Sequence, residues 1–329
     1  MRRISALTVA LVALIVAGTG DSANDVSLLA PSWSPDGASV AWVAGSRFGS
    51  QVWYAAADGT SPQPLGSVYD GITQAAWTPA GLVLDAHLKL FLLTPTGTST
   101  PIGSVLDTVY SVDAKGTKVA SAASCPTCTG AVQVLDLRTH KVTRIGVAAE
   151  SNTSPSLSPY GKRVVYRRLA CANGICGTAH GLWITPTTGG KGRRLLPDGL
   201  CARWSPDGRT IAYQTKAGEL RLVTVATGKS ALISKGISTC TVAAPPTWSP
   251  DSHRLAFVGN DRTLRIADTQ THKVLRRSSA SFGAVFGVSW SPDNTSLLLA
   301  VRPPGAGTCG SIWRFGASDG STAPIRACG

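Results

Sequence analysis

The sequence predicts an all-β protein built from seven similar units, and three observations favour this fold class. The sequence is rich in Val, Thr, Ser, Gly and Trp, which is typical of strands and turns. Residues that favour helices are scarce, because glutamate occurs only at Glu150 and Glu219 and there is a single methionine. A short tryptophan motif also recurs along the chain, and 35 Gly and 20 Pro divide the sequence into many short elements.

The recurring motif first appears as Trp33-Ser-Pro-Asp-Gly37, followed by the apolar run Val40-Ala41-Trp42. Proline fixes φ at a turn, aspartate accepts a bond from the backbone two residues on, and glycine tolerates positive φ. Each copy therefore predicts a tight turn between two strands, the first of which ends at the tryptophan. Clear copies begin at Trp204, Trp248 and Trp290, and weaker ones at Trp77, Val112 and Leu157, with spacings of 35 to 47 residues.

A second motif follows each anchor and consists of an alternating apolar strand, a small turn and a further strand. Its copies begin at Gln51, Leu90, Ala131, Gly181, Glu219, Thr263 and Ser311. Both motifs occur seven times, so each unit contains four antiparallel strands. Four-stranded units repeated every 40 to 50 residues or so are typical of propeller blades. The sequence therefore predicts a single seven-bladed β-propeller over residues 24–329. Six or eight blades are the alternatives if the weaker copies are misassigned or an end segment adds a blade.

The repeated tryptophans and aspartates are predicted to be structural. Adjoining blades diverge, and bulky apolar side chains fill the space between them, whereas the aspartates belong to turns. This structural set consists of Trp33, Asp36, Trp77, Trp204, Asp207, Trp248, Asp251, Trp290 and Asp293.

The pattern Trp-Ser-Pro-Asp-Gly-x-x-(Ile/Val)-Ala-(Tyr/Trp) resembles the repeat of TolB-like propellers, which are related to the WD-repeat class. The resemblance covers the chain from about Val26 to Cys328. It implies a propeller fold and a family that includes periplasmic binding scaffolds and the propeller caps of certain serine peptidases. TolB itself also carries an α/β domain, for which this chain has no room.

The first residues resemble a secretory signal. Met1-Arg2-Arg3 precedes an apolar run from Ile4 to Ala17, and small residues follow up to Ala23. The run is shorter than the roughly 20 residues that span a bilayer. We therefore expect residues 1–23 to be a signal peptide and the mature protein to be secreted, periplasmic or attached to the cell envelope.

Eight cysteines in an exported chain are expected to form disulfides. Nearness in sequence favours the pairs Cys125–Cys128, Cys171–Cys176, Cys201–Cys240 and Cys309–Cys328. Cross-pairing between the first two pairs is the main alternative, and zinc binding by those four thiolates is a weaker one. A final hairpin centred between Ser318 and Asp319 would place Cys309 directly opposite Cys328, within the distance that a disulfide bridges. That bond would secure the last strand in place of the strand exchange by which many propellers close.

The net charge of +13 arises from 31 basic and 18 acidic residues that are scattered along the chain. We expect weak, salt-sensitive binding to polyanions and no specific nucleic-acid site, because no aromatic residues are interleaved with the basic clusters. A protein or an envelope polymer is the expected partner, and the protein is expected to be a monomer.

No catalytic, cofactor-binding or metal-binding residues emerge from the motifs. The one G-x-S-x-G match, Gly316 to Gly320, falls in the last hairpin. None of the nine residues after Gly320 is an acid or a histidine, so the match is not a nucleophile elbow. The five histidines have no metal-ligand spacing and are interpreted as surface residues: His87, His140, His180, His253 and His272. The aspartates outside the predicted Ser-Pro-Asp and Asp-Gly turns show no catalytic spacing, and they include Asp70, Asp85, Asp107 and Asp198.

The expected function is therefore an exported, non-enzymatic binding scaffold for a protein, peptide or envelope ligand. The alternative is an enzyme built on the propeller itself, of the lactonase, lyase or glycosidase type, with catalytic groups on channel-facing loops. A single sequence hides such groups because several blades contribute them.

Overall fold

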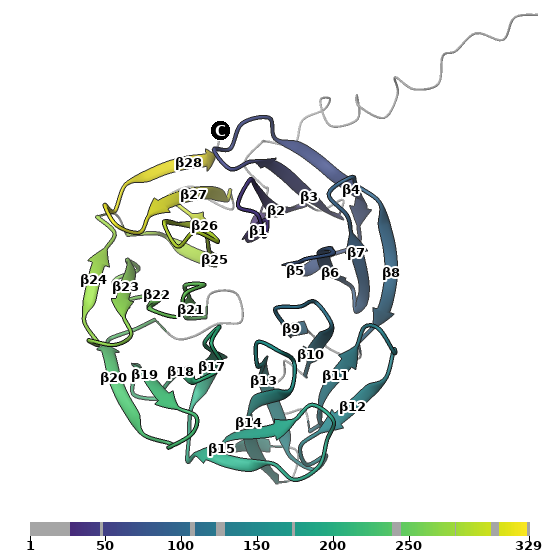
Figure 1. Ribbon diagram of the computed structural model, residues 1–329, viewed down its shortest axis with the longest axis vertical. Helices are drawn as coiled ribbons and strands as arrows, with labels where there is room; N and C mark the ends of the chain where they lie inside the picture. Colours follow the sequence, from purple (N-terminus) through teal and green to yellow (C-terminus); the bar gives the residue numbers. More distant parts are fainter. Residues whose placement is uncertain are drawn as a thin grey trace, which may run out of the picture.

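A computed structural model describes residues 27–46, 49–105, 109–122, 129–172, 175–238, 245–279, 281–303 and 309–327. It shows seven four-stranded antiparallel sheets arranged in a ring (Figure 1). The part of the chain that the structure describes contains no helix. The predicted seven-bladed β-propeller is confirmed. The predicted signal peptide, residues 1–23, lies outside the described residues.

In every blade the four strands follow one another in sequence from the centre outward. Blade 1 contains β1 (Ser27–Trp33), β2 (Ser39–Ser46), β3 (Gly49–Ala56) and β4 (Gln63–Tyr69). Blade 2 contains β5 (Ile72–Thr78), β6 (Gly81–Ala86), β7 (Lys89–Leu93) and β8 (Ser99–Ser104). Blade 3 contains β9 (Val109–Val112), β10 (Lys118–Ser121), β11 (Val132–Asp136) and β12 (Val142–Ile145).

The remaining four blades repeat this order. Blade 4 contains β13 (Ser151–Leu157), β14 (Arg163–Ala172), β15 (Ile175–Pro186) and β16 (Arg193–Leu196). Blade 5 contains β17 (Leu200–Trp204), β18 (Thr210–Gln214), β19 (Glu219–Thr224) and β20 (Ser230–Lys235). Blade 6 contains β21 (Thr247–Trp248), β22 (Arg254–Val258), β23 (Leu264–Asp268) and β24 (Val274–Arg277). Blade 7 contains β25 (Ala284–Trp290), β26 (Ser296–Arg302), β27 (Ser311–Gly316) and β28 (Thr322–Arg326).

The Ser-Pro-Asp turn joins the first and second strands of a blade through side-chain hydrogen bonds. In blade 1 the Ser34 hydroxyl donates to Asp36 Oδ1 at 2.5 Å and accepts from the Ser39 amide at 3.0 Å. Asp36 Oδ1 also accepts from the Ala38 amide at 3.0 Å, two residues on, as the turn chemistry predicts. The turns that begin at Ser205, Ser249 and Ser291 repeat this network.

The tryptophan that ends the innermost strand packs between blades. Trp33, Trp204, Trp248 and Trp290 are all buried, whereas Trp77 is half-buried. Two of them also bond the preceding blade, because Trp248 Nε1 donates to the Arg203 carbonyl and Trp290 Nε1 to the Thr247 carbonyl. An arginine of the preceding blade covers two of the rings, with Arg163 4.8 Å from Trp204 and Arg254 5.1 Å from Trp290.

The ring closes by packing and not by strand exchange. Blade 1 consists of β1–β4 and blade 7 of β25–β28, so neither borrows a strand from the other end of the chain. Leu28, Trp33 and Trp42 of blade 1 form one buried cluster with Leu298 and Ile312 of blade 7. The end of the C-terminal strand β28 lies next to the turn between β3 and β4 at the rim (Figure 1), where Gly59 contacts Ile325.

The predicted register of the last hairpin is correct only near its turn. Phe315 pairs with Thr322 and Trp313 with Pro324 as expected, but a bulge then shifts the ladder and Ile312 pairs with Arg326. The bulge adds one residue to one strand, which accounts for the shift. The predicted opposition of Cys309 and Cys328 itself lies outside the described residues, because Cys328 is not among them. The same third-to-fourth-strand pairing is shifted in six of the seven blades.

The Cys171–Cys176 disulfide is confirmed, and its Cα atoms lie 4.0 Å apart. It consumes two of the four thiolates of the alternative zinc site, which is therefore wrong. Cys201 and Cys309 are also disulfide-bonded. Their predicted partners, Cys240 and Cys328, lie outside the described residues, as do Cys125 and Cys128, so those pairings remain predictions.

Candidate functional site

The candidate site lies on blade 4, where two strands extend beyond their counterparts in other blades. β14 has 10 residues and β15 has 12, and together they form a long hairpin (Figure 1). The Cys171–Cys176 disulfide joins paired residues near the end of this hairpin. The hairpin thus gives the side chains along it a rigid support.

A carboxylate, a guanidinium and an imidazole meet at this hairpin. Glu150 precedes β13, Arg168 lies on β14 and His180 on β15. Glu150 Oε2 accepts from Arg168 Nε at 2.6 Å, and Glu150 Oε1 lies 3.0 Å from His180 Nδ1. The side chains of Glu150 and Arg168 are 14% and 13% exposed, whereas that of His180 is 45% exposed. A partly buried ion pair therefore holds an accessible imidazole.

Trp183 supports both basic members of this group. Its Nε1 donates to the His180 carbonyl at 3.0 Å, which fixes the backbone of β15 at this point. The Arg168 guanidinium lies 4.1 Å from the centre of the Trp183 ring. Because the Arg168 side chain is stacked and ion-paired at once, it has little freedom to release Glu150.

Asn152 fixes the loop that carries Glu150. Its Nδ2 donates to the carbonyls of Gly130, Val147 and Glu150 at 2.7, 2.7 and 3.1 Å. Asn152 is buried, and a Cβ on Gly146 would lie 2.3 Å from Asn152 Oδ1, so the loop leaves room only for glycine there. Glu150 is consequently positioned by the backbone as well as by Arg168.

The electrostatics keep Glu150 ionised. The hydrogen bond from Arg168 lowers the pKa of Glu150 below its ordinary value, and the bond with His180 acts in the same direction, although burial opposes both. In the neutral tautomer that carries its proton on Nδ1, the His180 imidazole donates to the Glu150 carboxylate and Nε2 carries no proton. No described residue bonds His180 Nε2, so this atom is available to take a proton from a bound molecule.

Sequence reasoning missed this site. His180 is exposed, as expected of a surface histidine, but the sequence did not reveal its contact with the partly buried Glu150, 30 residues away. The other four histidines are exposed, as expected. The available signal was the rarity of glutamate, because Glu150 is one of only two in the chain.

The acids singled out from the sequence do not form a site. Asp85 is buried and accepts from Thr73 Oγ1 and the Leu88 amide. Asp198 lies 3.6 Å from both Arg167 and Lys216. Asp70 is exposed, and Asp107 lies outside the described residues. Ser318 of the G-x-S-x-G match is exposed in the turn between β27 and β28.

Two further searches found nothing within the described ranges. No group of three or more His, Cys, Asp or Glu side chains there is placed to hold a metal ion. No helix in that part of the chain has the length and apolar character needed to cross a membrane.

Comparisons with known proteins identify the class as a β-propeller and no narrower family. No family model matches the chain, and no curated protein matches it significantly. Among solved structures, the oligogalacturonate lyase of Vibrio parahaemolyticus is similar at a TM-score of 0.67 and 12% identity, over 88% of this chain and 91% of that one. The Cps50 (Swd1) β-propeller domain of Myceliophteria thermophila gives 0.63 and 14%, over 90% and 99%.

Puromycin hydrolase is also similar, at a TM-score of 0.63 and 17% identity. The match covers 92% of this chain but only 53% of the hydrolase, so this chain corresponds to about half of that protein. Identities this low show the fold alone.

The comparisons correct the expected function. We expected a non-enzymatic scaffold, yet the similar structures include a lyase and a hydrolase. They agree better with the alternative, an enzyme built on the propeller. The scaffold expectation is therefore abandoned.

Proposed function

We propose that this protein is a propeller enzyme in which His180 acts as a general base. The observation that carries the proposal is the 3.0 Å contact between His180 Nδ1 and the ionised Glu150, which leaves an accessible Nε2. A carboxylate that orients an imidazole in this way is a recurrent arrangement in general-base catalysis.

The substrate class that we propose is an acidic oligosaccharide, and the reaction is β-elimination. Support comes from the net charge of +13, which attracts anions, and from the similarity to a lyase whose name specifies oligogalacturonate. His180 Nε2 would take the proton on the carbon next to the sugar carboxylate. The electron pair of that C–H bond forms a C=C bond, the bond to the β oxygen breaks, and the departing oxygen takes a proton from water.

We further propose that the protein is exported and belongs with TolB-like propellers. The Trp-Ser-Pro-Asp repeats and the apolar segment after Arg3 support this assignment. The Cys171–Cys176 disulfide is consistent with an extracellular location, because disulfides persist in oxidising compartments. Weak, salt-sensitive binding of polyanions and a monomeric state remain part of the proposal.

The test compares H180Q and E150Q with H253Q, a substitution at an exposed histidine of blade 6. Each protein is incubated with oligogalacturonate, and the unsaturated product is followed by ultraviolet absorbance. H180Q should lose about 10²- to 10⁴-fold in kcat, the usual contribution of a general base, whereas H253Q should match the wild type. E150Q should also lose activity because the imidazole is no longer oriented.

Two outcomes would contradict the proposal. The first is full activity of H180Q. The second is a wild-type protein that produces neither unsaturated ends nor new reducing ends from acidic oligosaccharides. New reducing ends without unsaturation would retain His180 as the base but change the reaction to hydrolysis.

A further inference from the structure

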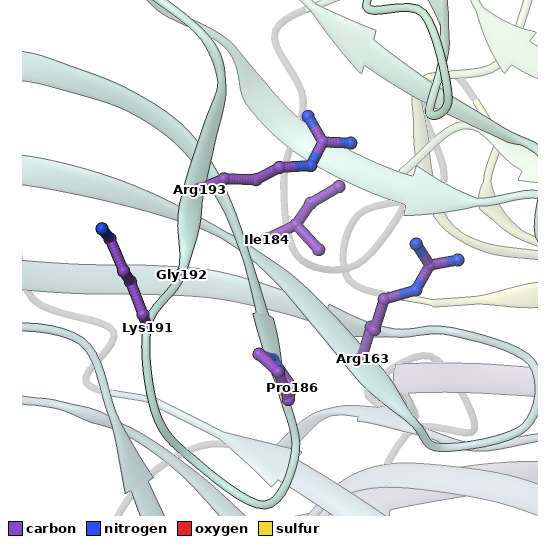
Figure 2. Close-up of a pocket in the computed structure, with 6 residues that line it drawn as sticks. All are labelled: Arg163, Ile184, Pro186, Lys191, Gly192 and Arg193. Atoms are coloured by element: carbon purple, nitrogen blue, oxygen red, sulfur yellow. The ribbon is translucent and has the colours of Figure 1, made fainter.

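A second site lies at the other end of β14, in a pocket of about 330 Å³. Its lining consists of Arg163, Ile184, Pro186, Lys191, Gly192 and Arg193 (Figure 2). Three of these six residues are cations and none is an acid. Figure 2 shows Ile184 between the side chains of Arg163 and Arg193, with Lys191 on the neighbouring turn.

The strand register explains why these residues meet. Arg163 pairs with Pro186 across β14 and β15, and Ile184 pairs with Arg193 across β15 and β16. Directly paired residues lie on the same face of a sheet. This face is directed at blade 5, since Arg193 Nη2 donates to the Val225 carbonyl and Arg163 covers the Trp204 ring.

The cations of this pocket have no acidic partner among the described residues. The ion pairs of the described chain involve other arginines and lysines, and the nearest on the same strand, Arg167 and Arg168, are paired with Asp198 and Glu150. Lys191 and Arg193 are exposed. Unpaired cations gathered around a concave surface produce a local positive potential that attracts anions.

A comparison with blade 6 shows that the Arg163 donors are unused. Arg254 occupies the equivalent place, covers Trp290, and donates from Nη2 to the Asn294 carbonyl at 2.6 Å. Arg163 covers Trp204 in the same way, but its guanidinium makes no hydrogen bond to the part of the chain that the structure describes. The N–H donors of its guanidinium therefore remain available. A guanidinium can donate two parallel hydrogen bonds to one carboxylate.

We infer that the pocket of Arg163, Lys191 and Arg193 binds the carboxylate groups of an acidic oligosaccharide, at a place separate from the Glu150–His180 site. Arg163 and Arg168 are five residues apart on β14, or about 16 Å at the usual rise of a strand. Successive side chains also alternate between faces, so the two sites lie on opposite faces of the blade 4 sheet.

The chemistry of the lining favours a sugar over a nucleic acid. The exposed Pro186 offers an apolar surface to the C–H face of a sugar ring, while the arginines meet its carboxylate. Ile184 is buried beneath this surface. Single-stranded nucleic acid binds by stacking on aromatic rings, but no aromatic residue lines the pocket and Arg163 already covers Trp204. The choice of an acidic oligosaccharide as the ligand rests on the proposed function. The inference that the pocket binds an anion rests only on its unpaired cations.

The experiment uses R163Q and R254Q as a matched pair. Both substitutions remove an arginine that covers a tryptophan, and R254Q also removes the hydrogen bond to the Asn294 carbonyl, but only Arg163 lines the pocket. The double variants K191Q/R193Q and R138Q/K141Q form a second pair, because both remove two exposed charges from the outer turn of a blade. Binding of tetragalacturonate is measured by calorimetry at two salt concentrations, with maltotetraose and a single-stranded DNA oligonucleotide as comparison ligands.

R163Q and K191Q/R193Q should each weaken tetragalacturonate binding by about tenfold and reduce its salt dependence, because fewer ion contacts form. R254Q and R138Q/K141Q should bind like the wild type, and maltotetraose should not bind. H180Q should bind normally, which separates this inference from the proposed catalytic role. Equal binding by both members of each pair, equal binding of the neutral sugar, or a loss confined to the DNA ligand would overturn it.

Discussion

The serine of each Trp-Ser-Pro-Asp motif connects a turn to the strand that follows it. Ser249 is fully buried, and its hydroxyl bonds Asp251 Oδ1, the Arg254 carbonyl and the Arg254 amide. At the scale of single residues, we therefore expect this hydroxyl to contribute to the free energy of unfolding.

Replacing Ser249 by alanine should lower the free energy of unfolding by about 1–3 kcal/mol, because it leaves buried polar groups without their partner. Urea unfolding monitored by tryptophan fluorescence measures the change. The matched control is T98A, at an exposed hydroxyl of blade 2, which should change stability by less than about 0.5 kcal/mol. Equal effects of the two substitutions would contradict this role.

The aspartates of the same turns should make the protein sensitive to acid. The hydrogen bond from Ser34 lowers the pKa of Asp36, and that from Ser291 lowers the pKa of Asp293, both below the ordinary value of 3.8. A depressed folded-state pKa stabilises the fold above the ordinary value, and the contribution is lost as pH falls through the folded-state pKa. Unfolding in urea should therefore become easier below about pH 4.

The variant D293N tests this linkage. It should be less stable than the wild type at pH 7, and the difference between the two proteins should shrink as the pH is lowered toward 3. A difference that stays constant with pH would show that the Asp293 charge makes no contribution.

At the scale of elements, the long hairpin of β14 and β15 distinguishes blade 4 from the other blades. It carries Arg168 and His180 on adjacent strands, and the Cys171–Cys176 disulfide closes it. A disulfide across so short a loop restricts the unfolded chain modestly, by about 2 kcal/mol in the chain-entropy treatment.

The double variant C171S/C176S should retain the fold and lower the free energy of unfolding by no more than about 2 kcal/mol. Amide exchange should accelerate at the end of the hairpin and remain unchanged in blades 1 and 6, because the bond acts locally. Mass spectrometry of peptides after exchange measures this pattern. Uniform acceleration across all blades would instead assign the disulfide a global role.

At the scale of the whole molecule, the ring depends on the contact between its first and last blades. Gly287 of β25 lies against Pro31 of β1, and a Cβ at Gly287 would lie 2.5 Å from the Pro31 Cδ atom. Because no strand of the described chain is exchanged, this packing closes the ring.

The substitution G287A should lower the thermal midpoint by several degrees, since overpacking typically costs about 1–3 kcal/mol. G130A is the control, because a Cβ there meets no atom within 4 Å. Thermal unfolding followed by circular dichroism measures both. If G287A and G130A behave alike, closure does not depend on this contact.

The sequence by itself determined the local chemistry and the number of blades. Each Trp-Ser-Pro-Asp turn is encoded within about seven residues, and such local signals repeat visibly. The roles of Trp33, Asp36 and their counterparts could therefore be predicted, as could the Cys171–Cys176 bond between near neighbours. Short-range hydrogen bonds depend on sequence spacing alone, which is why these predictions agree with the structure.

Only the tertiary structure decided which residues from different strands and blades contact one another. In blade 7 the bulge between the third and fourth strands shifts the register by one residue, which no motif reveals. Glu150 and His180 come together because β13, β14 and β15 are adjacent in one sheet, and Arg163 meets Arg193 across the same sheet. These contacts depend on strand register and on blade neighbours, and neither is a property of a local segment of sequence.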